Sequence, residues 1–188
     1  IVDAARNSPL TERFTRAGFP LVTEGEVFPS NVVPTVATNK QGKIAIFPMM
    51  WGFNVPGIDM IVNARTETAA EKPLFKDSWA AHRCIVPASY YFEWEHATKP
   101  NGKRAAVQKY AIQPQAENVT WLCGLYRIED GFPHFVILTV PPAETIAFIH
   151  DRMPLMIRKE RISKWVQPGI QPETLIDGAV QTLAFEAV

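Results

Sequence analysis

The chain has 188 residues, of which 47% are apolar and 20% charged, and nineteen basic and nineteen acidic side chains give a formal net charge of zero. This balance is typical of a soluble globular protein with one well-buried core, so a single domain over residues 1–188 is predicted. Zero net charge argues against a broad polyanion-binding surface, because such affinity depends on phosphate neutralisation by Lys and Arg. No apolar run approaches the ~20 residues that span a bilayer, so we expect no membrane partner and no signal peptide.

The two cysteines, Cys84 and Cys123, both lie in apolar, strand-like sequence. They are typical of reduced core thiols in a cytoplasmic protein, and a catalytic role is less expected because no helix N-terminus or cationic cluster surrounds them. The four histidines show no metal-ligand spacing, and the sequence has no Gly-rich phosphate loop. The sequence therefore predicts no metal, no cofactor and a cytoplasmic location, nucleoid-associated if the source is bacterial.

The first elements are predicted from capping and turn residues. A helix begins at Ser8-Pro9, a cap residue followed by proline at the first helical position, and ends at Gly18. A polar turn in the middle of residues 35–50 predicts a hairpin there. A short helix is expected over residues 74–81.

Strands dominate the rest of the chain. The predicted strands span residues 84–86, 90–96, 109–113, 119–126, 134–139 and 155–157. One further helix is predicted to start at Pro141-Pro142 and to end at His150, and another covers residues 158–166. We expect an α+β fold, in which helices flank a curved, mostly antiparallel, barrel-like sheet.

Three short polar segments, at residues 63–68, 90–94 and 149–154, are each set in apolar sequence. They place an amide, a carboxylate, an imidazole and two arginines among residues that otherwise suit a core. An unpaired buried polar group costs ~1–3 kcal/mol, so three such segments are expected to pair with one another. The sequence therefore predicts one site that handles protons and accepts anions, although it offers no obvious nucleophile.

Each candidate residue also has an ordinary structural interpretation. Glu93 lies mid-strand between two aromatic residues, where it is either a buried general acid–base or an outward charge beside Glu95. His150 alone is typical of a capping or salt-bridged histidine at a helix end. Asn63 alone is typical of a turn residue that bonds its own backbone. The functional interpretation depends on the three segments being taken together.

The chain resembles the SOS-response-associated peptidase (SRAP) family over most of its length. The resemblance depends on the order and spacing of short segments at residues 31–35, 51–52, 63–68, 73–75, 83–87, 92–94, 124–125, 137–139 and 149–154. The family implies one SRAP domain that senses abasic sites in single-stranded DNA. It also implies autocatalytic removal of the initiator methionine, after which the N-terminal cysteine closes a thiazolidine ring on the sugar aldehyde.

The resemblance implies a role for individual residues. Asn63 would hold the N-terminal cysteine and its adduct, and Glu93 would act as the acid–base group for methionine removal and imine formation. His150 would protonate the sugar oxygen and take part in crosslink reversal. The two arginines at 65 and 152 would contact phosphate or orient the site, and two tryptophans would stack on bases or wedge them apart. The predicted DNA-binding residues are Arg65, Trp51, Trp94, Arg152, Thr139 and Arg83.

The reactive cysteine itself is expected upstream of Ile1, because the family begins Met-Cys-Gly-Arg and this chain begins Ile1-Val2-Asp3. A trimmed C-terminus is expected as well. With that cysteine, the leading hypothesis is a monomeric covalent sensor of abasic sites. Without it, the alternative is a non-covalent binding module for single-stranded or gapped DNA. A third hypothesis is an unrelated hydrolase in which Glu93 works with Glu67 or His150 and an activated water.

Overall fold

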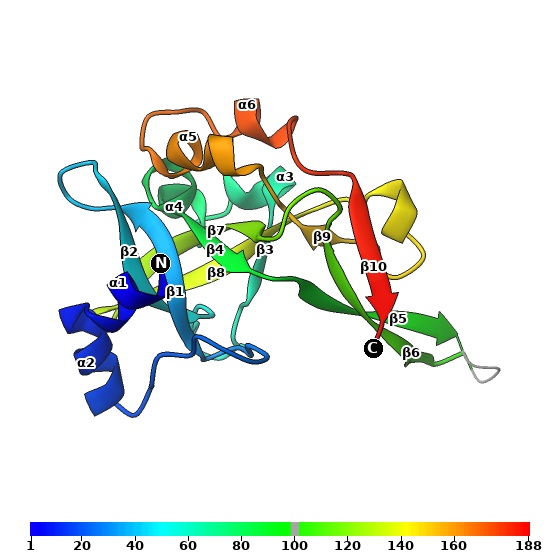
Figure 1. The fold of residues 1–188 in the computed structure, drawn as a ribbon, viewed down its shortest axis with the longest axis horizontal. Helices are drawn as coiled ribbons and strands as arrows, with labels where there is room; N and C mark the ends of the chain where they lie inside the picture. The colour runs from blue at the N-terminus through cyan, green and yellow to red at the C-terminus, as the bar shows by residue number, and fades with distance from the viewer. Residues whose placement is uncertain (99–101) are drawn as a thin grey trace.

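Five strands form a closed barrel in the computed structural model, which describes residues 1–98 and 102–188 (Figure 1). Neighbouring strands run antiparallel in the order β2-β1-β4-β7-β8, and β8 closes the circle by pairing in parallel with β2. The strands are β1 (Val32–Thr38), β2 (Ile44–Trp51), β4 (Arg83–Ala88), β7 (Thr120–Glu129) and β8 (Phe132–Val140). The predicted curved, mostly antiparallel and barrel-like sheet is therefore confirmed.

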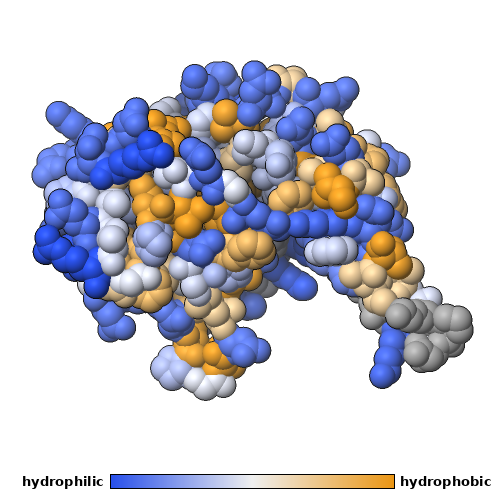
Figure 2. All heavy atoms as spheres, turned by 60° about the horizontal axis from the view of Figure 1, so that its bottom comes forward, coloured by the Kyte–Doolittle hydropathy of each residue, from blue (hydrophilic) through white to orange (hydrophobic). Residues whose placement is uncertain are grey.

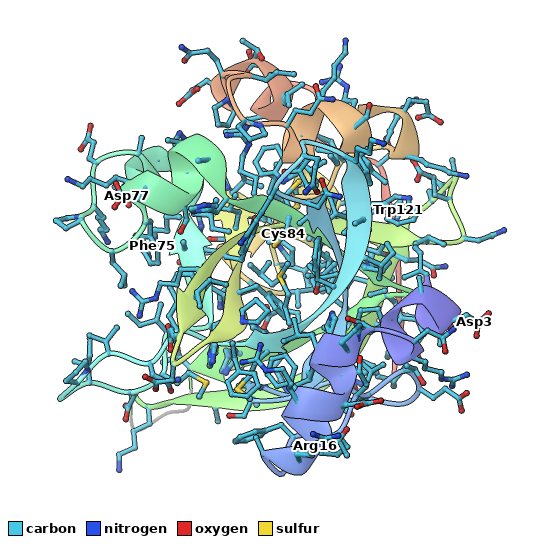
Figure 3. All side chains as sticks on the ribbon, turned by 90° about the vertical axis from the view of Figure 1, so that its left-hand side faces the viewer. Asp3, Arg16, Phe75, Asp77, Cys84 and Trp121 are labelled. Carbon is cyan, nitrogen blue, oxygen red and sulfur yellow. The ribbon has the colours of Figure 1, made fainter. Side chains whose placement is uncertain are left out.

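Large apolar side chains and both cysteines belong to the core of the barrel. Ile85, Leu125 and Leu138 are fully buried in one continuous core. Only glycine fits at position 124, because a Cβ there would lie 2.8 Å from the carbonyl oxygen of Val136. The thiols of Cys84 and Cys123 are free and buried, and burial raises the pKa of each. Figure 3 shows Cys84 among the strands at the centre of the molecule.

A second, three-stranded antiparallel sheet stands beside the barrel, in the order β10-β6-β5 (Figure 1). Its strands are β5 (Tyr91–Thr98), β6 (Arg104–Pro114) and β10 (Leu183–Ala187). Tyr91, Ile112 and Leu183 are buried in the main core, so the base of this sheet is anchored in the barrel. The β5–β6 hairpin then extends away from the body of the protein, and Figure 2 shows both hydrophobic and hydrophilic residues on it.

Two short strands attach to the C-terminal end of β8, one along each edge. β3 (Asn63–Arg65) runs parallel to β8 and pairs Arg65 with Thr139. β9 (Met153–Pro154) runs antiparallel to β8 and pairs Pro154 with the same Thr139. The segments at residues 63–68 and 149–154 therefore meet across one strand, as their polar content predicted.

The helices are short and lie around the sheets. They are α1 (Val2–Arg6), α2 (Pro9–Arg16), α3 (Thr66–Ala69), α4 (Lys76–Ala81), α5 (Ile162–Val166) and α6 (Glu173–Ile176), with 3₁₀ turns η1 (Glu144–Ile146) and η2 (Lys159–Arg161). The predicted start of α2 is confirmed, because Ser8 caps it through the N–H of Leu10 and proline follows at the first position. No helix in the described part of the chain is long and apolar enough to cross a membrane.

Two element predictions were wrong. The helix expected between Pro141 and His150 is only the single 3₁₀ turn η1. The buried residues Ile146 and Ile149 are three apart, a spacing that a 3₁₀ turn brings onto one side as well as an α-helix does. The strand expected over residues 155–157 lies earlier, as β9, and Met156 makes only an isolated bridge.

Candidate active site

A bidentate ion pair between Arg152 and Glu67 lies at the centre of the candidate site. Arg152 Nη1 and Nη2 lie 2.6 and 2.8 Å from the two carboxylate oxygens of Glu67. These charge-assisted hydrogen bonds lower the pKa of Glu67 to about 2. The pair is neutral as a whole, so the charge of Arg152 is compensated within the protein, and its predicted contact with DNA phosphate stays a prediction.

The backbone carbonyl of Thr139 joins this ion pair to the barrel. It accepts hydrogen bonds from Arg152 Nη2 at 2.6 Å and from Thr66 Oγ1 at 3.2 Å. Thr139 is 8% exposed, and its hydroxyl donates to the carbonyl of Ala64 at 3.5 Å. These contacts fix α3 and β9 to the end of β8, and the predicted DNA contact of Thr139 stays a prediction.

Strand β3 presents two of the predicted side chains to solvent. Asn63 and Arg65 are exposed, whereas Ala64 between them is buried, as the alternation of a strand requires. Trp51 holds the residue that precedes β3 in place, because its indole N–H donates to the carbonyl of Val62 at 3.0 Å. The indole is half-buried and stacks on Phe135, so Trp51 has a structural contact in addition to its predicted role in DNA binding.

His150 is half-buried and held by the backbone that follows it. Three groups contact its Nδ1: the N–H of Arg152 at 3.0 Å, the carbonyl oxygen of Arg152 at 3.2 Å and a carboxylate oxygen of Asp151 at 3.2 Å. Nδ1 donates or accepts according to the tautomer of the ring, so these contacts fix the position of the imidazole and not the nitrogen that carries its proton. The proton donation by His150 stays a prediction.

Glu93 and Trp94 lie on opposite faces of β5 in the second sheet. Glu93 is half-buried, and its carboxylate accepts a hydrogen bond from the N–H of Trp94 at 3.0 Å. Tyr91 shares the face of Glu93, and Tyr110 of β6 is its register partner on that face. Trp94 is 45% exposed, so its ring is available for stacking on a base.

The structure joins two of the three predicted segments at β8 and places the third on the other sheet. β3, which contains Asn63 and Arg65, and β9, which follows His150 and Arg152, pair with opposite edges of β8. Glu93 belongs to the second sheet, and no hydrogen bond within residues 1–98 and 102–188 links it to Asn63 or His150. The predicted proton-handling groups therefore come from two different sheets.

The prediction that Arg83 binds DNA is wrong. Arg83 is 1% exposed, and its guanidinium donates to backbone carbonyl groups of the protein itself. The carbonyl acceptors are those of Trp79, Ala80, Trp165, Gln167 and Ile170. Arg83 is a structural residue that joins the ends of α4 and α5, and it cannot reach a phosphate.

Three buried polar atoms lack a hydrogen-bond partner in the described part of the chain. They are Thr68 Oγ1, Tyr91 Oη and Arg152 Nε, and each belongs to a different one of the three polar segments. The sequence reasoning did not single out Thr68 or Tyr91, because a threonine and a tyrosine in apolar sequence look like ordinary packing residues. Unsatisfied polar atoms are uncommon in folded proteins, and a catalytic role is one of the explanations for them.

Replacing Tyr91 with phenylalanine is expected to raise the free energy of unfolding by about 1 kcal/mol. The change removes a buried hydroxyl group that has no partner among the described residues and keeps the ring that packs in the core. Urea denaturation followed by tryptophan fluorescence measures the effect. Tyr126→Phe is the control on a half-buried tyrosine, and a clear loss of stability in Tyr91→Phe would show that the hydroxyl is bonded after all.

The described residues contain no group of three or more His, Cys, Asp or Glu side chains that could hold a metal ion. Glu67 is paired with Arg152 instead, and His150 lies against Asp151. The site therefore offers an amide, a carboxylate, an imidazole and a paired arginine as its chemical groups.

Comparison with known proteins identifies relatives of this chain. The family model described as "SOS response associated peptidase (SRAP)" matches residues 5–187. The chain is 33% identical over 167 residues to the abasic site processing protein YobE of Bacillus subtilis, covering 77% of this chain and 71% of that protein. It is 29% identical over 126 residues to the abasic site processing protein YedK of Escherichia coli, covering 65% of this chain and 55% of that protein.

Solved structures share the fold. A phage-related protein from Bordetella bronchiseptica superposes with a TM-score of 0.72 at 20% identity, covering 96% of this chain and 91% of that one. A protein from Bacteroides thetaiotaomicron gives a TM-score of 0.71 at 19% identity, covering 95% and 82%. At these identities the likeness concerns the arrangement of the strands and helices alone.

Proposed function

Because the chain belongs to the SOS response associated peptidase family, we propose that it senses abasic sites in single-stranded DNA and crosslinks to them covalently. The crosslink forms through an N-terminal cysteine upstream of Ile1, after the protein has removed its own initiator methionine. The names of the relatives, abasic site processing proteins, support an abasic-site-related role in DNA binding. The pairing of β3 and β9 with the same Thr139 of β8, joined by the ion pair of Arg152 with Glu67, is the observation that carries the proposal, because β3 contains Asn63 and His150 precedes β9 by three residues.

The proposed chemistry joins an aminothiol to an aldehyde. The cysteine amine adds to the aldehyde carbon of the ring-opened sugar, and loss of one water gives an imine. The thiol then adds to the imine carbon, its proton passes to the nitrogen, and the thiazolidine ring closes. These steps need a group that moves protons between nitrogen and oxygen and a donor that assists the departure of water.

The half-buried Glu93 carboxylate is the proposed proton carrier, and the half-buried imidazole of His150 is the proposed donor to the sugar oxygen. The exposed amide of Asn63 holds the cysteine and its adduct. Arg65 and Trp94 are exposed and contact the phosphate and the bases, while Arg152 orients the site through Glu67. Few basic side chains take part, so binding depends only weakly on salt concentration.

The test uses the protein expressed from its natural start codon and an oligonucleotide with one abasic site. A denaturing gel measures the rate at which a heat-stable shifted band forms. Glu93→Gln and His150→Gln are each expected to slow this rate by about 10²-fold, the usual contribution of one general acid or base. The matched control is Glu95→Gln, two residues further along the same strand face, and it should change the rate less than about twofold. No band with wild-type protein, while native binding persists, would replace the proposal with the non-covalent module.

A further inference from the structure

An aromatic cluster of Phe148, Tyr110 and Phe185 connects the two sheets that carry the proposed catalytic groups. The three rings contact one another edge to face, with centroid distances of 5.8 Å for Phe148–Tyr110, 5.8 Å for Tyr110–Phe185 and 5.5 Å for Phe148–Phe185. Phe148 follows η1, Tyr110 belongs to β6 and Phe185 belongs to β10. Figure 1 shows the yellow segment after β8 next to β10, which is where this contact forms.

Two members of the cluster are neighbours of the proposed catalytic groups: Phe148 is near His150 in sequence, and Tyr110 is paired with Glu93 in the sheet. Phe148 precedes His150 by two residues. Tyr110 is the register partner of Glu93 in the antiparallel β5–β6 pair, so their side chains share one face. The tyrosine hydroxyl also donates to Glu95 at 3.1 Å on that face. The contact between the rings of Phe148 and Tyr110 therefore connects the segment that contains His150 with the pair of strands that contains Glu93.

Little else in the described structure fixes the outer part of the second sheet. Tyr91 is buried in the core at the start of β5, but the strand is mostly exposed from Trp94 onward. On the opposite face, Lys109 forms an ion pair with Glu26 at 2.7 Å, and an ion pair at the surface contributes little to stability. Phe148 and Phe185 are 52% and 40% exposed, yet edge-to-face pairs still stabilise their contacts.

We propose that Phe148 is a positioning residue, which holds His150 at the working separation from Glu93 by packing against Tyr110 and Phe185. This inference rests on the proposed function, because both groups must act on one bound sugar. Reacting groups displaced by about 1 Å can lose about 10²-fold in rate. The cluster thus sets the geometry of a site whose two proton-handling groups belong to different sheets.

The kinetic test compares Phe148→Ala with wild type in single-turnover crosslinking. We expect the rate to fall about 10- to 100-fold with native DNA binding unchanged, and Phe148→Tyr to restore it to within about threefold of wild type. Phe19→Ala is the control, since Phe19 is similarly exposed and belongs to the segment after α2. In a Glu93→Gln background the Phe148→Ala change should add no further loss, because the two act on one step. Additive losses or an unchanged rate would overturn the proposal.

A second measurement does not depend on activity. Amide hydrogen exchange at residues 149–151 is expected to become at least about tenfold faster in Phe148→Ala, with exchange in β1 and β2 unchanged. Unchanged exchange at residues 149–151 overturns the proposal whether or not the wild type forms a crosslink. If the wild type forms none, the proposed function fails, and the exchange rates still decide whether the cluster orders the His150 segment.

Discussion

Replacing Arg83 with methionine is expected to lower the free energy of unfolding by about 3–5 kcal/mol, the usual effect of breaking a buried charged network. The guanidinium is 1% exposed and donates to five backbone carbonyl groups. Burial lowers the pKa of Arg83, which shows that desolvation opposes its charge. Methionine fills the space but leaves the buried carbonyl oxygens at the ends of α4 and α5 without donors, and each loss is costly.

Urea denaturation followed by circular dichroism measures this effect. Arg83→Lys should also lose stability, because one ammonium group cannot reach carbonyl groups on several sides. The control is Arg16→Met, whose side chain is 80% exposed and whose loss should stay within about 0.5 kcal/mol. A loss below about 1 kcal/mol in Arg83→Met would contradict the structural role given to Arg83 here.

Replacing Arg152 with alanine is expected to slow crosslinking by about 10²-fold and to lower the free energy of unfolding by about 2 kcal/mol. The change removes the hydrogen bonds that Arg152 donates to Glu67 and to the carbonyl of Thr139. Without them α3 and the segment around His150 lose their side-chain link to each other and to Thr139, and only the pairing of β3 and β9 with β8 and the hydrogen bond from Thr66 to Thr139 still hold them. Glu67→Gln should cause a smaller loss of the same kind, because an amide can still accept from Arg152.

A double-mutant cycle of Arg152→Ala and Glu67→Gln separates the ion pair from other effects of each change. The pair should also make stability depend on pH. The pKa of Glu67 is lowered to about 2 in the folded protein from an ordinary value of 4.5. The stabilisation is therefore complete above about pH 4.5 and is lost as the pH falls through about 2. Glu67 is 47% exposed, so solvent screening limits this contribution to about 1 kcal/mol. Equal acid sensitivity of wild type and Glu67→Gln would contradict this assignment.

The barrel strands were predictable because their apolar, β-branched runs are bounded by turn residues. The hairpin expected over residues 35–50 forms as β1 and β2. A barrel-like sheet was expected, but the strand pairs that close it were not predictable, since the parallel pairing of β2 and β3 along one edge of β8 joins residues far apart in sequence. No periodicity within a single segment carries information on such a pairing.

The candidate site could be predicted in its composition and partly in its geometry. An arginine and a glutamate in separate polar segments do pair, as Arg152 and Glu67 show. The same reasoning failed for Arg83, because its acceptors are carbonyl groups at distant helix ends, which no side-chain pattern reveals. The contact of Phe148 with Tyr110 was equally hidden, since it depends on how the second sheet sits against the segment after η1.

The full burial of Cys84 and Cys123 makes cysteine alkylation selective in the folded protein. Both thiols are enclosed, and burial keeps them in the unreactive protonated form at neutral pH. An iodoacetamide or maleimide reagent that labels the native protein would therefore report on the proposed cysteine upstream of Ile1, whereas labelling in denaturant would add these two. The number of thiols labelled in the native protein is therefore a direct assay for the reactive thiol, independent of DNA, and the increase in denaturant accounts for Cys84 and Cys123.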